Sequence, residues 1–374
     1  MPAQPTEATG EPITIGMINQ ENTPAGSFPE LSQAAIGFVD WINEELGGVD
    51  GRPLALEVCN TGFSAEGSTA CGQRFAQAGA PVVLGGIDVF GNAIDVLRDN
   101  DVPFVGGIPV SMQSMKSANS FQWSGGTWGA TVAFAQHAAS EGAKKVAIVY
   151  GDFGSIAEGA RFGEQTLAAD GVAVQMVPFP IVATDLATPM QAAWSGEPDA
   201  IFVLAADTGC GAAYNAVRTI GITATMYYVG ACAAPNITEA AGPEVVDGAI
   251  FNVEGPVQPD DPDPDVALYN SVMATYAPDL NPVGAATVSA RSMMNLYVVL
   301  RSLGADGITS AAITDELRAS SEASSFMGHP YTCDGEQLAD LTATCAPQQI
   351  LITSEDGELS QIGGWIDVRA AYPG

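Results

Sequence analysis

The chain contains few basic residues. Only 12 of its 374 residues are Lys or Arg, against 43 Asp or Glu, so the formal net charge is −31 at pH 7. Such a surface cannot replace the counterions of a nucleic acid backbone, and an anionic membrane surface does not attract it. The composition therefore argues against nucleic acids and anionic membrane surfaces as partners. We interpret the acidity as a solubility adaptation of an exported protein.

Long apolar runs are also missing. No stretch approaches the roughly 18 consecutive apolar residues of a membrane-spanning helix, so none is predicted. No signal peptide is visible either. Residues 1–10 are predicted to be a disordered lead with an added initiator Met, left after removal of a signal or lipid-anchor segment. With 47% hydrophobic and 15% charged residues, the composition is typical of a globular protein, and its length predicts two domains.

The motifs of common α/β enzymes are absent. No Gly-x-Gly-x-x-Gly follows the first predicted strand, and the chain has neither a Gly-x-Ser-x-Gly elbow nor a phosphate-binding loop. His137 lies in a predicted helix, where packing is its expected role, and His329 lies on a predicted connection, where a hinge role is expected. The sequence therefore predicts no catalytic residue, no metal site and no cofactor, and the protein is predicted not to be an enzyme.

The chain has six cysteines, which fall into three pairs close in sequence: Cys59 and Cys71, Cys210 and Cys232, Cys333 and Cys345. No Cys-x-x-Cys is present, and both histidines are far from the cysteines in sequence, which argues against zinc. An even number in local pairs fits three disulfides formed in an oxidising compartment. Six cysteines allow several pairings, and buried free thiols are the alternative.

Two apolar runs organise the first part of the chain. Pro81–Asp88 and Val102–Pro109 each contain a short Val-rich or Phe-containing segment followed by Gly-Gly. Runs of this kind predict strands buried on both faces of a parallel sheet. The Gly-Gly pair leaves room for another backbone or a ligand at the carboxyl end of each strand, where α/β sheets bind ligands. The alternative is that it only forms a tight turn.

Strands and helices alternate along most of the chain. In the first half, strands are predicted at 13–19, 54–58, 81–87 and 102–108, with helices at 29–46, 64–77 and 92–98. The segment Phe121–Trp123 interrupts this rhythm, and the alternation then restarts with strands at 145–150, 172–177, 200–205, 225–229 and 249–253. This pattern predicts an α/β fold with two doubly wound parallel-sheet lobes. Helices near 266–276, 285–303 and 313–319 and a hairpin within 349–368 complete the prediction.

Several of these segments together resemble the type I periplasmic binding proteins, most of all the leucine-isoleucine-valine receptors of ABC importers. The matching segments are Ile13–Gly16, Gly47–Leu54, Leu84–Gly86, Lys144–Gly154, Pro198–Val203 and Ala216–Ile222. A cysteine pair flanking the second helix also fits. The resemblance extends from Ile13 to Val368 and rests on the order and spacing of these segments.

The resemblance implies that the chain crosses three times between the lobes, near 121–126, 253–257 and 326–331. The N-terminal lobe would then contain 11–122 and 256–328, and the C-terminal lobe 123–255 and 329–374. It further implies two lobes that close on a small solute in the cleft between them. Such a protein is a monomeric solute-binding component that delivers its solute to membrane permease subunits. It is exported, and is periplasmic or tethered to the outer face of the cytoplasmic membrane.

The resemblance also implies which residues bind the ligand. From the first lobe they are Phe28, Gly86, Ile87, Asp88, Phe90, Pro109, Val110 and Ser111, and from the second Phe153, Asp207, Thr208 and Cys232. Trp123 and Trp128 flank the first crossing and are expected to stack on the ligand. Backbone amides after Gly86 and around Val110 are the expected hydrogen-bond donors.

The chain departs from amino-acid receptors at some of these positions. Asp88 and Phe90 stand where such receptors usually carry Ser or Thr hydroxyls, and Ala231 or Cys232 stands in place of an acidic residue. A neutral or cationic head group near Asp88 or Asp207 is therefore predicted, on an amino-acid-like, aromatic or amide solute. The alternative for Asp88 is a helix N-cap. The alternative function is a ligand-sensing ectodomain of a receptor with the same fold.

Overall fold

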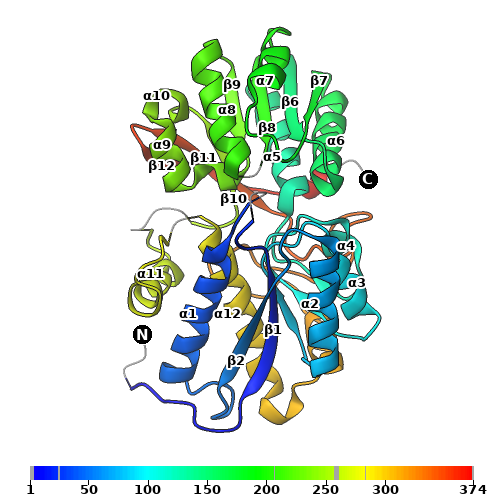
Figure 1. The fold of residues 1–374 in the computed structure, drawn as a ribbon, viewed down its shortest axis with the longest axis vertical. Helices are drawn as coiled ribbons and strands as arrows, with labels where there is room; N and C mark the ends of the chain where they lie inside the picture. Colours follow the sequence, from blue (N-terminus) through cyan, green and yellow to red (C-terminus); the bar gives the residue numbers. More distant parts are fainter. Residues whose placement is uncertain (1–3, 24–25, 206, 257–260, 283, 373–374) are drawn as a thin grey trace. The chain divides into compact units, whose positions relative to one another are not determined.

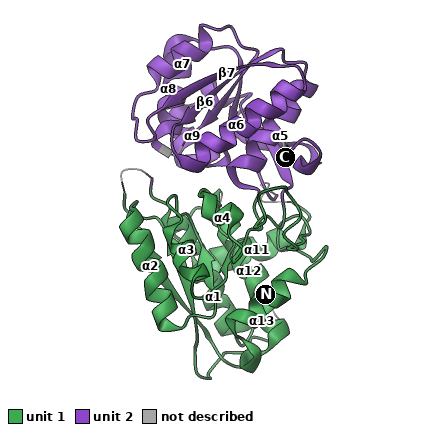
Figure 2. Ribbon diagram, turned by 90° about the vertical axis from the view of Figure 1, so that its right-hand side faces the viewer, with its two compact units in different colours: residues 1–23, 27–124, 259–346 green, residues 24–26, 125–258, 347–374 purple. Residues whose placement is uncertain are grey.

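The fold is taken from a computed structural model, which describes residues 4–23, 26–205, 207–256, 261–282 and 284–372. The chain divides into two compact units, shown in different colours in Figure 2. Unit 1 comprises residues 1–23, 27–124 and 259–346, and unit 2 comprises residues 24–26, 125–258 and 347–374. Each unit contains its own sheet, so the predicted fold class is confirmed.

The sheet of unit 1 has five parallel strands in the order β2-β1-β3-β4-β5. Their bounds are β1 Ile13–Asn19, β2 Leu54–Asn60, β3 Val83–Gly85, β4 Phe104–Val105 and β5 Ser120–Phe121. The order reverses direction at β1, as in other doubly wound sheets, and ligands bind such sheets beyond the carboxyl ends of the strands.

Helices cover both faces of this sheet (Figure 1). One face packs on α1 (Pro29–Glu45), α11 (Pro264–Tyr276), α12 (Ala285–Leu303) and α13 (Ser310–Arg318), and the other on α2 (Ala65–Ala78) and α3 (Asn92–Arg98). Alternate residues of β1 serve the two faces: Ile15 and Met17 pack with Phe38 of α1, whereas Ile18 packs with Phe75 of α2. Because both faces are covered, β1 is apolar except at Thr14 and Asn19.

Unit 2 has a sheet of seven strands in the order β12-β11-β10-β9-β8-β6-β7. The parallel strands are β6 Lys145–Gly151, β7 Ala173–Phe179, β8 Ala200–Leu204, β9 Thr225–Tyr228 and β10 Ile250–Val253, and the antiparallel pair is β11 Gln349–Glu355 and β12 Glu358–Ile366. The predicted hairpin at the end of the chain therefore extends this sheet.

The helices of unit 2 also lie on both faces of their sheet. α7 (Ala187–Trp194), α8 (Asp207–Ile220), α9 (Pro235–Ala241) and α10 (Pro243–Val246) bury one face. α5 (Gly126–Ser140) packs on the other face, where Phe134 contacts Phe202 of β8 and Tyr227 of β9, and α6 (Gly154–Ala169) packs beside α5. Short 3-10 turns lie at Gly230–Ala233 and Val368–Ala370 in unit 2 and at Ala305–Gly307 in unit 1.

The two Gly-Gly pairs allow the loops after β3 and β4 to approach each other. Gly106 and Gly107 have φ angles of +65° and +82°, which favour glycine. A Cβ on Gly107 would lie 2.5 Å from the carbonyl carbon of Gly85. The close neighbour is thus another backbone, one of the possibilities that the sequence left open. Both strands are shorter than their predicted bounds.

The unit boundaries differ from the predicted lobes at one crossing. The first boundary lies after Ser124, the second after Gln258 and the third after Ala346, whereas the sequence placed the third at residue 328. The chain from 329 to 346 stays with unit 1 because Gln122 accepts a hydrogen bond from the Cys345 amide and donates one to the Ala343 carbonyl, each 2.8 Å long. It thereby lies beside the end of β5, like a further strand.

The predicted disordered lead is wrong for the residues that the structure describes. Thr6 and Ala8 donate backbone hydrogen bonds to the carbonyls of Glu45 and Asn43, and Thr9 and Gly10 donate to Gly51. These contacts fix the segment against the end of α1 and the turn that follows it. Residues 1–3 lie outside the described part of the chain.

All three local cysteine pairs form disulfides. Their Cα–Cα distances are 5.7 Å for Cys59–Cys71, 5.3 Å for Cys210–Cys232 and 4.4 Å for Cys333–Cys345. The first joins the end of β2 to α2, the second joins α8 to the turn after β9, and the third closes the segment that pairs with β5. The alternative of buried free thiols is excluded, because no free cysteine remains.

Candidate functional site

At the carboxyl edge of the unit 1 sheet, Asn19 connects two loops. Its Nδ2 donates to the Phe28 carbonyl at 2.7 Å and to the Glu21 carboxylate at 3.1 Å, and its Oδ1 accepts from the Ile87 amide at 3.1 Å. The side chain is fully buried. Asn19 thus fixes the start of α1 and the loop after β3 relative to β1.

Asp88 is buried in the loop after β3 and is 5% exposed. Its Oδ2 accepts from the Ser68 hydroxyl at 2.6 Å, and its Oδ1 accepts from the Phe90 amide at 3.3 Å. Burial raises the pKa of this carboxyl group, and the hydrogen bonds from Ser68 and from the Gly91 and Phe90 amides oppose the rise. Ser68 also accepts from the Ala93 amide at 2.8 Å, so the pair joins α2 to the first turn of α3. Asp88 orders its loop, and α3 has Gly91 as its N-cap.

The first two backbone amides after β3, in the loop expected to supply ligand donors, are engaged within unit 1. The Gly86 amide donates to the Ile18 carbonyl at 2.8 Å, and the Ile87 amide donates to Asn19. The Gly86 carbonyl accepts from Ile108, which follows β4. These bonds hold the loops after β1, β3 and β4 together, so their polar groups stabilise unit 1 itself.

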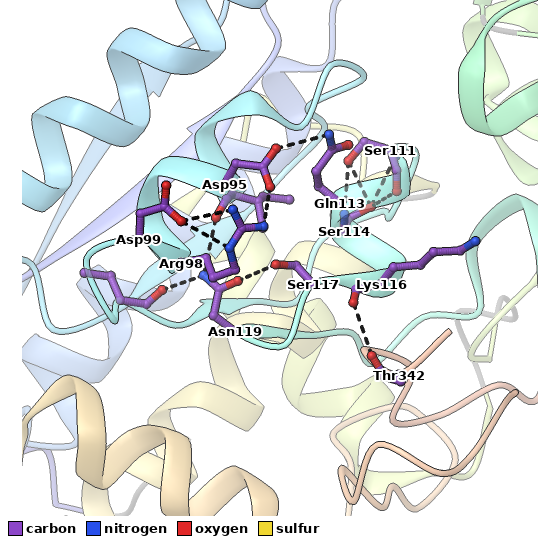
Figure 3. A network of polar contacts seen from close by, with 12 residues as sticks. Asp95, Arg98, Asp99, Ser111, Gln113, Ser114, Lys116, Ser117, Asn119 and Thr342 are labelled. Atoms are coloured by element: carbon purple, nitrogen blue, oxygen red, sulfur yellow. Dashed lines mark hydrogen bonds and ion pairs between the residues drawn. The ribbon is translucent and has the colours of Figure 1, made fainter. Parts of the chain in front are cut away.

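Ser111 is the N-cap of the short helix α4 (Met112–Lys116) and is 2% exposed. Its hydroxyl and amide are both within hydrogen-bonding distance of Ser114, in a capping box. Figure 3 shows this pair beside Gln113, whose Nε2 donates to Asp95 of α3 at 3.2 Å. A Cβ on Gly91 would lie 2.6 Å from the Ser111 Oγ. The loops after β3 and β4 are therefore in close contact at this edge.

Most of the predicted aromatic residues are buried. Phe28, Trp123 and Trp128 are 7%, 2% and 0% exposed. Phe28 and Trp123 belong to the core of unit 1, where the Trp123 ring lies edge-on to Tyr331 with centroids 5.7 Å apart. The Nε1 groups of Trp123 and Trp128 have no hydrogen-bond partner among the described residues. Phe90 is only partly buried and packs edge-on against Phe63 at 5.4 Å.

The remaining first-lobe positions lie in the same loops of unit 1. Gly86, Ile87 and Pro109 are buried, and Val110 is partly exposed. Phe90 and Val110 are thus the two predicted positions of unit 1 whose side chains retain some access to solvent.

The carboxyl edge of the unit 2 sheet carries Phe153, Thr208 and Cys232. Phe153 is the N-cap of α6, just after β6, and is half-buried, whereas Thr208 in the first turn of α8 is exposed. Asp207 is the first residue of α8, and its side chain lies outside the described part. Cys232 is fully buried, and its carbonyl accepts from the Tyr214 hydroxyl at 3.0 Å. Its sulfur is used in the disulfide, so it contributes no thiol.

Three residues at these edges were missed by the sequence analysis: Asn19, Ser68 and Thr61. Thr61 follows β2, is 2% exposed, and its hydroxyl has no partner among the described residues. Asn19 ends β1 and Thr61 directly follows β2, so both are polar residues at a strand end, a signal present in the sequence. Ser68 lies inside α2, and nothing in its local sequence separates it from an ordinary helical serine.

The described residues contain no cluster of three or more His, Cys, Asp or Glu side chains that could hold a metal ion. None of the helices in the described part is both long and apolar enough to cross a bilayer.

The fold has many solved relatives at low sequence identity. A leucine-binding protein from Thermotoga maritima superposes with a TM-score of 0.79 at 16% identity, covering 95% of this chain and 99% of that one. A fatty acid ABC transporter substrate-binding protein from Thermomonospora curvata gives 0.81 at 15% identity, covering 98% and 95%. An ABC transporter solute-binding protein from Rhodopseudomonas palustris, in complex with 3,4-dihydroxybenzoic acid, gives 0.80 at 16% identity, covering 96% and 98%.

Among curated protein sequences, none is significantly similar to this chain. The sequence model of one family, described as periplasmic binding protein, matches residues 12–343, which include both sheets except β11 and β12. The predicted resemblance is confirmed by this match and by the shared fold: the chain belongs to the periplasmic binding protein family.

Proposed function

We propose that this protein is the extracytoplasmic solute-binding component of an ABC importer, and that it closes on a small amino-acid-like, aromatic or amide solute without changing it chemically. The observation that carries the proposal is the family match over residues 12–343. In support, the structural neighbours from T. curvata and R. palustris are named as ABC transporter proteins. Its expected partners are permease subunits of the importer.

We further propose that the predicted site residues act in two ways. Phe90, Val110, Phe153 and Thr208 retain exposed surface at the carboxyl ends of strands, where α/β sheets bind ligands, and would contact the solute. Asp88, Ser111 and Trp123 are buried and already engaged within unit 1. Their role would be to hold the contact loops in shape.

The charge of the protein supports a neutral or cationic head group. A net charge of −31 attracts cations and repels free carboxylates. Asp88 and Asp207 were the two carboxylates expected to receive the head group. Since Asp88 already accepts hydrogen bonds from Ser68 and Phe90, Asp207 remains the proposed acceptor.

A ligand panel tests this function. Thermal-shift measurements should include leucine, phenylalanine, arginine, primary amides, hydroxybenzoates and a medium-chain fatty acid, and hits should be confirmed by calorimetry. We expect stabilisation by a compound with a neutral or cationic head and an apolar body, together with a smaller radius of gyration in solution scattering. Binding of only free carboxylates would contradict the head-group assignment, and turnover of the bound compound would contradict the absence of chemistry.

Phe153 offers a sharper test, because a matched control lies on the same helix. Phe153→Ala should weaken binding of the solute roughly tenfold through lost aromatic contact. Phe162 is also half-buried on α6, with its ring 5.0 Å from that of Tyr372. Phe162→Ala should leave affinity unchanged. Equal effects of the two substitutions would show that Phe153 acts through the stability of α6 and not through contact.

A further inference from the structure

Glu254 lies just after β10, close in sequence to the second crossing, at which the chain leaves unit 2. Its Oε1 accepts two hydrogen bonds, one from the Gly125 amide at 2.8 Å and one from Gln349 Nε2 at 2.7 Å. Gly125 is the first residue of unit 2 after the first crossing, and Gln349 is the third after the last crossing. One carboxylate therefore contacts segments that are 129 and 95 residues away in sequence.

The first of these bonds places a negative charge at the beginning of α5. Gly125 is the N-cap of that helix and has no side chain with which to cap it. An anionic acceptor near the first turn satisfies a free amide and interacts favourably with the helix dipole. Glu254 thus supplies from a distant segment the cap that the local sequence lacks.

The second bond fixes a buried amide side chain. Gln349 is 0% exposed, and its Oε1 accepts from Asn252 Nδ2 at 3.0 Å. Asn252 in turn accepts from the Gly230 amide at 2.9 Å, where β9 ends. Since both ends of the Gln349 amide are bonded, its orientation is set by Asn252 on one side and by Glu254 on the other.

Two glycines make room for this arrangement. A Cβ on Gly125 would lie 2.8 Å from Gln349 Nε2, and one on Gly129 would lie 3.0 Å from the same atom. Gly125 is the N-cap of α5, and Gly129 lies within the helix, where glycine is otherwise a poor choice for stability. Their presence indicates that close approach of the Gln349 amide to α5 is built into the sequence.

We propose that Glu254 is a positioning residue that holds the three crossing segments together within unit 2. Movement between the units is then confined to the parts of the chain outside this cluster. This proposal rests on the proposed function, because only a protein that closes on its solute needs a defined hinge. The cluster comprises Gly125, Asn252, Glu254 and Gln349.

The test compares Glu254→Ala with Glu254→Gln, which keeps one acceptor oxygen. Glu358→Ala is the control, because it removes an exposed carboxylate of the same unit outside the cluster. Amide hydrogen exchange of peptides covering 123–130 and 347–352 requires no solute. We expect Glu254→Ala to accelerate exchange in both peptides by about tenfold or more, since each loses a hydrogen bond to a charged group. Glu254→Gln should restore much of the protection, and Glu358→Ala should match the parent.

Solute binding is the second measurement. Glu254→Ala should weaken the affinity for the compound found in the ligand panel by about fivefold or more, a typical size for coupling between sites, with partial rescue by Glu254→Gln. Unchanged exchange in both peptides would overturn the proposal, as would faster exchange with unchanged affinity. If Glu254→Ala does not fold, Glu254→Gln must itself show faster exchange than the parent, or the proposal is wrong. Failure to find any solute would count against the proposed function alone.

Discussion

The carboxyl edges of the two sheets differ in how they use their polar groups. In unit 1, Asn19 bonds to a neighbouring loop, Asp88 bonds to α2 and Ser111 caps α4, and all three are buried. In unit 2, Phe153 and Thr208 retain exposed surface directly after their strands. A residue at a strand end is therefore not equivalent to a binding residue. The first edge is mainly built from residues that shape loops, and the second presents side chains to solvent.

Strand length explains much of this difference. β3 and β4 have three and two residues, and the chain after each continues through a loop before the next helix begins. Such loops carry many backbone groups that need partners, which Asn19, Ser68 and Ser111 supply. β6 has seven residues, and α6 begins only three residues after it, so fewer backbone groups need side-chain partners there.

The largest expected effect is the difference in lost stability between a substitution of Trp123 and one of Phe153. Trp123→Ala should lower the free energy of unfolding by about 3–5 kcal/mol, because it removes a large buried side chain from the core of unit 1. Phe153→Ala should cost about 1 kcal/mol or less, since its side chain is only half-buried. Denaturant unfolding measures both. If Trp123→Ala keeps the stability of the parent but no longer binds the solute, the result would support the stacking role predicted from sequence.

The architecture could be predicted from sequence because its signals are long and periodic. The helix at 285–303 has its predicted bounds, and the strand and helix alternation of both units agrees with the structure to within a few residues for most elements. α4, α9 and α10 were missed; each has only four to seven residues, a length over which a helical period is weak, although α3 with seven residues was predicted. The third crossing was misplaced because the pairing of 343–345 with Gln122 is non-local.

The candidate site was less predictable, for a physical reason. Sequence position relative to a strand indicates which edge a residue occupies, and this held for Asp88, Ser111 and Phe153. It cannot indicate whether the side chain forms hydrogen bonds within its own unit or is exposed to solvent. Asp88 lies in a loop and its partner Ser68 lies 20 residues earlier, in α2, and only the folded chain brings the two together.

The disulfides give the next test of the comparison, because unit 1 contains two and unit 2 contains one. Cys59 is partly exposed, whereas both Cys210 and Cys232 are fully buried. A mild reductant acting on the native protein should therefore open Cys59–Cys71 before Cys210–Cys232, as read by alkylation and peptide mapping. Replacing either pair with serines should lower the free energy of unfolding by about 3 kcal/mol in the loop-entropy account. Reduction of the Cys210–Cys232 bond first would mean that its surroundings in unit 2 open more readily than the edge of unit 1.

The smallest expected effect is an opposite response of the two units to acid. In unit 1, burial raises the pKa of Asp88 above its ordinary value of 3.8, so the folded state favours the neutral form. The folded protein therefore takes up this proton before the unfolded chain does, and Asp88 adds stability as the pH falls from its folded pKa toward 3.8. In unit 2, burial lowers the pKa of His137 below 6.5, against a weaker opposing effect of Glu141, and its Nδ1 lies 2.8 Å from the Tyr227 hydroxyl. The unfolded chain protonates first here, so His137 removes stability as the pH falls below 6.5.

Two variants isolate these contributions when unfolding is measured from about pH 7.5 down to about pH 4. Relative to Asp88→Asn, the parent should become more stable on acidification, and relative to His137→Gln it should become less stable. Each difference is expected to be below about 1 kcal/mol, because Asp88 keeps opposing hydrogen bonds and His137 is only half-buried. The same sign of change for both variants would show that net charge, and not the burial of these two groups, controls the acid response of both units.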